Sequence, residues 1–198
     1  MADVSDTISS SIAKFDLAHP DLLTPEGNHK LNDRWVLWAH DEGKGWSAQD
    51  YTKMAVIATV EDFWNVFNGL PSLNYKDMWF LMREGIPPLW EDPINLEGGS
   101  FKFRVAGSAV DNTWLTLALH LVTENMCLNV MDAQTISGMG LSPKKNNFAT
   151  ISVWNLDSSN TAHSQFPKNI DGIDFAMSRY DTHRKLAHKY TQRYNECP

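Results

Sequence analysis

Two tryptophans and a glutamate stand out as residues that could hold a flat ligand. Trp46 ends the glycine-containing loop 43–46, and Trp90 lies beside Glu91 in the proline-stiffened segment GIPPLWEDP. Two indoles on separate loops can stack on both faces of a ring, and such stacking contributes roughly 1–3 kcal/mol per nucleic-acid base. A carboxylate next to one indole can accept two N–H bonds from a purine edge, and guanine offers such an edge.

A positively charged base would be held more tightly by these residues. N7-methylguanine is such a base, and a desolvated cation–π contact adds up to about 2 kcal/mol. We expect Lys102 and Arg104, which alternate on one strand face, and Lys144 and Lys145, in the turn SPKKNN, to take phosphates. The chain has eight tryptophans, and large indoles are mostly buried in cores. Two loop tryptophans that only seal the core therefore remain an alternative.

Catalytic and metal-binding patterns are missing from the sequence. It contains no CxxC, HExxH or calcium-loop spacing, and the pair His120 and Glu124 is typical of a surface contact. There is no GxSxG elbow, and neither Cys127 nor Cys197 lies in a catalytic context. The stretch 138–140, GMG, lacks the third glycine of a dinucleotide fingerprint, so we expect a turn there. We expect no enzyme activity, no metal and no cofactor.

Composition predicts one globular domain. The 198 residues are 42% hydrophobic and 21% charged, and the net charge of −7 disfavours a nucleic-acid binder with a broad basic face. Residues 1–99 carry a net charge of −9 and residues 100–198 a net charge of +2, which places an anion site in the second half. No apolar run reaches the roughly 18–20 residues of a membrane span, and no secretory signal is recognised. Two cysteines make no disulfide framework, which favours a reduced intracellular setting.

Apolar periodicity and capping residues predict an α+β domain. Thr59 and Asp62 form a capping-box pattern before a helix that ends at Gly69. Asp111 or Asn112 is expected to cap a second helix. The remaining expected elements are strands near 35–38, 78–82, 100–107, 130–138, 148–154 and 173–177, a short helix over 157–166 and a helical basic tail over 184–196. Residues 1–28 are predicted to be a flexible leader, and 29–198 one domain in which an antiparallel sheet is backed by helices.

Several segments resemble the eukaryotic translation initiation factor 4E family, the mRNA cap-binding proteins. The resemblance covers residues 29–154, with a weaker continuation to 185, and the order and tryptophan spacing of VEDFW and GIPPLWED are highly specific. The matching segments are HKLNDRWVLW (29–38), GKGW (43–46), TVEDFW (59–64), GIPPLWEDP (85–93), GGSF (98–101), NTWLTLAL (112–119) and ATISVW (149–154).

This resemblance implies a fold and a ligand. The fold would be a curved antiparallel sheet with about three helices on its convex face and a cap pocket on its concave side. Trp46 and Trp90 match the two stacking tryptophans, Glu91 matches the carboxylate that reads the guanine edge, and Trp154 matches the residue that touches the N7-methyl group. The ligand would be the 7-methylguanosine 5′ cap of mRNA.

The resemblance also implies a protein partner and a cellular role. The dorsal surface would accept a Tyr-x-x-x-x-Leu-hydrophobic helix from a 4G-like scaffold or a 4E-binding protein. Its matching residues are His29, Val60, Trp64, Leu115 and Leu119. A monomeric, cytoplasmic protein with a possible nuclear fraction is expected, acting in translation initiation or its regulation.

Departures from the family pattern concern the phosphates. Ser100 and Phe101 replace an arginine and a tryptophan after the double glycine. Lys144 or Lys145 aligns with the second phosphate-binding arginine, and Lys185 lies in a segment that resembles the C-terminal loop near the phosphates. Because lysine lacks the bidentate fork of arginine, we expect altered dependence on phosphates. The chain thus resembles a divergent paralogue, and the alternative is a sequestering module that binds the cap weakly.

Overall fold

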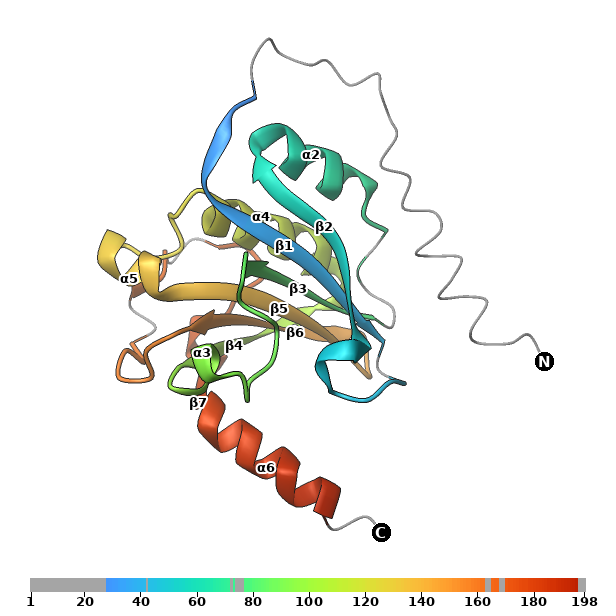
Figure 1. Ribbon diagram of the computed structural model, residues 1–198. Coiled ribbons are helices and arrows are strands. Elements are labelled where there is room, and N and C mark those ends of the chain that lie inside the picture. The colour runs from blue at the N-terminus through green and yellow to red at the C-terminus, as the bar shows by residue number, and fades with distance from the viewer. Residues whose placement is uncertain are drawn as a thin grey trace, which may run out of the picture.

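Seven antiparallel strands form one curved sheet at the centre of the molecule (Figure 1). The computed structural model describes residues 28–41, 43–71, 73, 77–162, 165–167 and 170–195. The strands are β1 (Lys30–Asp41), β2 (Tyr51–Thr59), β3 (Asp77–Arg83), β4 (Gly99–Ala106), β5 (Ile136–Lys144), β6 (Phe148–Asn155) and β7 (Arg179–Thr182). Their order in the sheet is β2-β1-β3-β5-β6-β4-β7. The expected leader lies outside the described residues, apart from its last residue.

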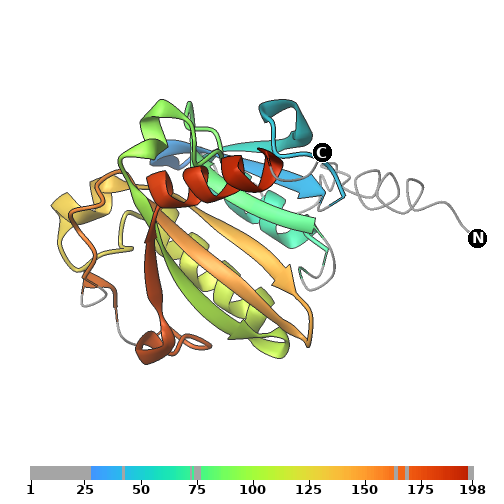
Figure 2. The same cartoon turned by 90° about the horizontal axis from the view of Figure 1, so that it is seen from below.

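Helices lie on both faces of this sheet. The α-helices are α2 (Val60–Gly69), α3 (Pro93–Leu96), α4 (Val110–Val122), α5 (Val130–Thr135) and α6 (His183–Asn195). Short 3₁₀ turns are η1 (Ala48–Asp50), η2 (Gly107–Ala109) and η4 (Phe175–Met177). Figure 2 shows α6 crossing the concave face while α4 lies behind the sheet. No helix within the described ranges is long and apolar enough to cross a membrane.

The expected α+β class and curved antiparallel sheet are confirmed, and the helices differ in one detail. We expected about three helices on the convex face. In the part of the chain that the structure describes, α2, α4 and α5 all supply apolar side chains to the main core beneath that face, α5 through Ala133. The basic tail is helical as expected, but as α6 it crosses the concave face (Figure 2).

Strict alternation along β4 separates two cores. Phe101, Phe103 and Val105 are fully buried against the convex-side helices. The side chains between them, those of Lys102 and Arg104, therefore point to the concave face. A second, smaller cluster lies on that concave face and is built around Met78, Phe80, Met82 and Trp154. We call this group the concave cluster.

The predicted capping box of α2 is present. Thr59 Oγ1 accepts a hydrogen bond from Asp62 N at 3.0 Å, and Asp62 Oδ2 accepts one from Thr59 N at 2.9 Å. Phe63 and Val66 then point into the main core. The cap therefore fixes which face of α2 is buried and which remains exposed.

One prediction about a helix was wrong, since neither Asp111 nor Asn112 caps α4, and one strand was missed. The second helix, α4, begins at Val110 without an aspartate cap, because Asp111 Oδ1 instead accepts a hydrogen bond from Leu73 N at 2.9 Å. Strand β2 was missed, since it is an edge strand in which only Ile57 is fully buried and no clear alternation exists.

The second half contains four further differences. Residues 130–135 form helix α5, capped by Asn129, and the strand begins only at 136. The segment 138–140 lies inside β5 and is not a turn. The described residues of 157–166 form no α-helix, and 173–177 holds η4 instead of a strand because Asp174 caps that turn.

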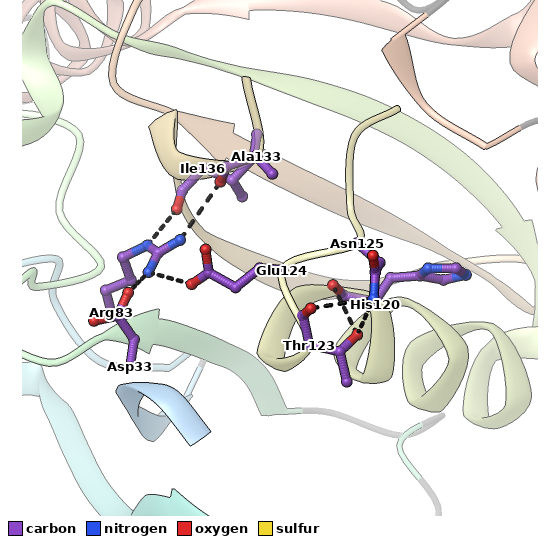
Figure 3. A network of polar contacts seen from close by, with 8 residues as sticks. All are labelled: Asp33, Arg83, His120, Thr123, Glu124, Asn125, Ala133 and Ile136. Atoms are coloured by element: carbon purple, nitrogen blue, oxygen red, sulfur yellow. Dashed lines mark hydrogen bonds and ion pairs between the residues drawn. The ribbon is translucent and has the colours of Figure 1, made fainter. Parts of the chain in front are cut away.

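One arginine joins four chain segments at the end of the sheet (Figure 3). Arg83 forms ion pairs with Asp33 and with Glu124, the latter at 2.9 Å. Its Nε donates to the carbonyl of Ile136 at 2.8 Å, and Nη2 donates to that of Ala133 at 3.4 Å. Glu124 lies beyond the end of α4, with φ of 60°, and points to Arg83 and away from His120.

We expect Arg83→Met to destabilise the fold. It leaves the half-buried Glu124 carboxylate and two carbonyls without their donor, which costs about 2–4 kcal/mol. Urea unfolding monitored by circular dichroism measures this loss. Arg34→Met is the matched control, because Arg34 forms an exposed pair with Glu84 and such pairs contribute about 0–1 kcal/mol. Equal effects of the two substitutions would contradict the role of Arg83.

Candidate functional site

A cavity of about 840 Å³ opens on the concave side of the sheet. Its size is within the usual range for small-ligand sites, about 300–1,000 Å³. It brings together six residues singled out from the sequence, namely Trp46, Trp90, Glu91, Lys102, Lys144 and Trp154. These residues come from two loops and three strands, so the fold assembles the site from distant segments.

The floor of the cavity is a row of residues across five strands. Phe80 pairs with Gly140, Gly140 with Ser152, Ser152 with Lys102, and Lys102 with Arg179. Directly paired residues project from the same face of a sheet, so all five line the cavity. A Cβ at Gly140 would lie 2.8 Å from the Phe80 ring. Glycine at this position therefore makes room for the aromatic side chain.

Trp46 forms one wall and is held by a buried histidine. The His40 ring stacks on the indole with centroids 4.4 Å apart and an angle of 16° between planes. His40 is 1% exposed, and its Nε2 is 2.7 Å from the carbonyl of Gly45. Because a carbonyl only accepts, Nε2 carries the proton. His40 therefore covers one face of Trp46, which also lines the cavity.

A local hydrogen-bond pattern closes the Trp46 loop. The Asp50 carboxylate accepts bonds from Ser47 N at 2.8 Å and from Ser47 Oγ at 2.6 Å. These bonds hold the pKa of Asp50 below its usual value. A Cβ at Gly45 would lie 2.8 Å from Asp50 Oδ2. A larger residue at this position would therefore displace the carboxylate that holds Ser47.

Trp90 forms another wall of the cavity, and Asn95 positions its loop. The side-chain amide of this fully buried residue donates to the carbonyls of Pro87 at 2.8 Å and Leu89 at 2.9 Å. The backbone carbonyl of Asn95 accepts a bond from His183 Nδ1 at 2.8 Å. Helix α3 thus links the Trp90 loop to the beginning of α6.

Trp154 belongs to the concave cluster and also lines the cavity. It is 2% exposed, and its Nε1 donates to Ser152 Oγ at 3.1 Å. Its ring centroid is 6.3 Å from that of Trp90 and 4.6 Å from that of His183. Burial lowers the pKa of His183 to about 4, so this imidazole is neutral at pH 7.

The cavity carries charges of both signs. Asp50 and Glu91 lie with the aromatic walls, whereas Lys102, Lys144 and Arg179 supply positive charge. Lys102 is half-buried, and desolvation lowers its pKa. A ligand with a cationic ring and an anionic tail would match this distribution.

Three predicted phosphate contacts do not line the cavity. Lys145 and Lys185 are exposed, and the Arg104 guanidinium lies 4.0 Å from the Phe148 ring centroid. Sequence reasoning also missed His40, Asn95, Arg179 and His183. The Asp-Pro pair before Asn95 is a helix-start signal that could have located α3.

The expected dorsal residues lie on the convex side. Val60 and Trp64 are 40% and 41% exposed, although both are apolar and lie one turn apart on α2. Phe63, between them, is buried, so this helix presents apolar side chains to both core and solvent. Leu115 and Leu119 are half-buried on α4.

The fifth dorsal residue, His29, is tied to α2. Its Nδ1 lies 2.7 Å from Glu61 Oε1, and its backbone N–H donates to Glu61 Oε2 at 3.1 Å. The carbonyl of His29 accepts a bond from Val60 N at 2.9 Å. These bonds lower the pKa of Glu61 and fix the residue before β1 beside the exposed apolar side chains.

A family model, two curated relatives and a solved structure that match this chain all belong to the same family. The model of the family described as eukaryotic initiation factor 4E matches residues 30–196. Translation initiation factor 4E-3 of Caenorhabditis elegans is 37% identical over 118 residues, 53% of this chain and 45% of that protein. Translation initiation factor 4E of Saccharomyces cerevisiae is 34% identical over 155 residues, 72% of this chain and 66% of that protein. The chain thus spans between about half and two thirds of the length of these relatives.

A solved structure shares the architecture. The Caenorhabditis elegans factor 4E-3, in complex with the 4E-binding protein Mextli and a cap analogue, superimposes with a TM-score of 0.67 at 26% sequence identity. The match covers 82% of this chain and 96% of that one.

We expect His40→Ala to loosen Trp46 and His40→Phe to retain its position. Alanine uncovers the indole face on which His40 stacks and removes a ring contact of about 0.5–1.5 kcal/mol. Phenylalanine keeps an aromatic ring on that face. Acrylamide quenching, compared with the same variants in a Trp46→Phe background, isolates the signal of Trp46. Equal quenching of the alanine and phenylalanine variants would show that the stack does not hold the indole.

Proposed function

Because the chain belongs to the eukaryotic initiation factor 4E family, we propose that it binds the 7-methylguanosine 5′ cap of mRNA in the concave cavity. The observation that carries this proposal is the position of Trp46, Trp90 and Glu91 around one cavity whose base is Trp154. The methylated base stacks between the two indoles, and its positive charge adds a cation–π contribution.

Base recognition follows from the chemistry of the walls. Glu91 is exposed at the rim and accepts the N1–H and the exocyclic amine of guanine. The Trp90 backbone N–H serves the O6 atom, and the indole of Trp154 contacts the N7-methyl group. Another base would leave the Glu91 carboxylate without its two donors, which costs binding free energy.

The phosphates lie toward the basic side chains of the cavity. Lys144 and Lys102 line the cavity and supply positive charge there. Ser100, the position at which an arginine was expected, is fully buried and does not line the cavity. Phe101, the neighbouring departure, belongs to the main core on the other face. Neither departure closes the site, which supports cap binding over the alternative of a cap-weak module.

The family that the chain belongs to is one of translation initiation factors, and we propose that this chain, too, acts by binding. The proposed place of action is the cytoplasm, where capped mRNA is translated, and the role is translation initiation or its regulation.

We expect Trp46→Ala and Trp90→Ala each to weaken 7-methyl-GTP binding at least tenfold, because each removes one stacking surface. Glu91→Gln keeps the shape and removes the charge, with an expected loss of about tenfold to a hundredfold. Tryptophan-fluorescence titration with 7-methyl-GTP, run beside GTP, measures these affinities.

A glutamate outside the cavity serves as the control for Glu91. Glu84→Gln removes one negative charge from an exposed residue that pairs with Arg34, and we expect no change in affinity. A wild-type protein that binds GTP as well as 7-methyl-GTP would refute recognition of the charged base.

The dorsal surface is proposed to bind a helix of the Tyr-x-x-x-x-Leu-hydrophobic type. Val60 and Trp64 offer an apolar stripe at helical spacing, and Leu115 and Leu119 extend it onto α4. A partner helix that lays its apolar face on such residues would cover them. The bound protein is a 4G-like scaffold or a 4E-binding protein.

We expect Trp64→Ala to abolish binding of a peptide of that type and to leave 7-methyl-GTP binding unchanged. A tryptophan at the centre of an interface commonly contributes 2 kcal/mol or more, which corresponds to at least about thirtyfold in affinity. Fluorescence anisotropy of a labelled peptide measures the loss. Met131→Ala is the control, because Met131 is apolar and 69% exposed on α5. Loss of both peptide and 7-methyl-GTP binding would mean that Trp64 is structural.

A further inference from the structure

Position 100 poses a problem for phosphate recognition. A serine stands where the family pattern has an arginine, and the structure buries it completely. Ser100 pairs across the strands with Asp181 of β7 and with Trp154 of β6. No cation reaches the cavity from this position, so recognition of the phosphates must use another row of the sheet.

The next row of paired residues on this face contains two cations, and the carboxylate of Asp181 bridges them. Lys102 pairs with Arg179 of β7, and both side chains line the cavity. Asp181 Oδ2 lies 3.0 Å from Lys102 Nζ and 3.4 Å from Arg179 Nε. The carboxylate lies deeper, with its side chain 19% exposed, whereas that of Arg179 is 72% exposed.

We propose that Arg179, the first residue of β7, is the phosphate-binding arginine of this chain, held together with Lys102 by the bridging carboxylate of Asp181. The inference rests on the proposed cap-binding function and assigns its phosphate site. The fork that the family pattern places on β4 comes here from the neighbouring strand.

The charges favour this assignment. The Lys102 and Arg179 cations outnumber the single Asp181 carboxylate, and Lys144 adds a third cation at the same cavity. Since Arg179 Nε faces Asp181, both Nη atoms remain for a phosphate, and two parallel N–H donors match its oxygens. The Asp181 contact orients the guanidinium before the ligand arrives, which reduces the entropy lost on binding.

The position of Lys102 is consistent with a role for both cations. Its Nζ lies 5.8 Å from the centroid of the Trp90 ring, so it stands next to the proposed base site. Lys102 therefore contacts the phosphate nearest the nucleoside. Arg179 lies on the edge strand, beyond Lys102, and serves the more distal phosphates.

The test compares ligands that differ only in their phosphates. Titration of 7-methylguanosine, its monophosphate, diphosphate and triphosphate into Arg179→Ala and the wild type separates base from phosphate binding. We expect unchanged affinity for 7-methylguanosine and a loss of about tenfold for 7-methyl-GTP, the lower end of the range for a hydrogen bond to a charged group at this exposed site. Arg179→Lys keeps the charge without the fork and should lie between the two.

A matched variant controls for net charge. Lys189→Ala removes one positive charge from an exposed residue of α6 that does not line the cavity, and we expect wild-type affinity for every ligand. Unchanged 7-methyl-GTP affinity in Arg179→Ala, with the wild type still preferring 7-methyl-GTP to GTP, would overturn the assignment alone. An equal loss for 7-methylguanosine and its triphosphate would mark Arg179 as structural and would also overturn it. A wild type that does not prefer 7-methyl-GTP would refute the cap-binding proposal itself, and this assignment with it.

Discussion

Cross-strand register is the constraint on which the site depends. Alternation along β4 places Phe101 and Phe103 in the main core and leaves Lys102 on the concave face. The pairing of β4 with β6 and β7 then puts Ser152 and Arg179 beside Lys102. A shift by one residue would bury the cations and expose the phenylalanines, so the burial of the convex core also fixes the composition of the cavity floor.

The aromatic walls are not positioned by strand pairing, because Trp46 and Trp90 lie in loops. Each loop tryptophan is positioned by a buried polar residue that satisfies backbone carbonyls: His40 for the Trp46 loop and Asn95 for the Trp90 loop. His40 and Asn95 are themselves buried, and a buried polar side chain without its partner is costly, which favours these loop conformations. The aromatic walls therefore stand in position before any ligand binds, which lowers the cost of binding.

Much of this arrangement is readable from the sequence, and the rest depends on contacts between distant segments. The capping box at Thr59 and the alternation of β4 are local signals, and both are confirmed. The resemblance placed Trp46, Trp90, Glu91 and Trp154 around one pocket, and the structure brings them together.

What the sequence did not reveal has physical reasons. Strand β7 is only four residues long and is defined by its pairing with β4, so Arg179 carried no local signal. Asp111 has the right type for a helix cap, but its carboxylate is used by Leu73 from another segment.

The separation of charge in the cavity has a consequence for the kinetics of recognition. The chain as a whole carries a net charge of −7, which repels the polyanionic backbone of RNA at long range. The cavity itself is lined by Lys102, Lys144 and Arg179, whereas the chain as a whole is acidic, so internal stretches of RNA gain little by lying along the protein. A terminal nucleotide with a positively charged base can enter the cavity with its base leading and its phosphates following. On the proposed function, electrostatics thus selects the end of an mRNA over its interior before any base contact forms, and this selection weakens as salt screens the field.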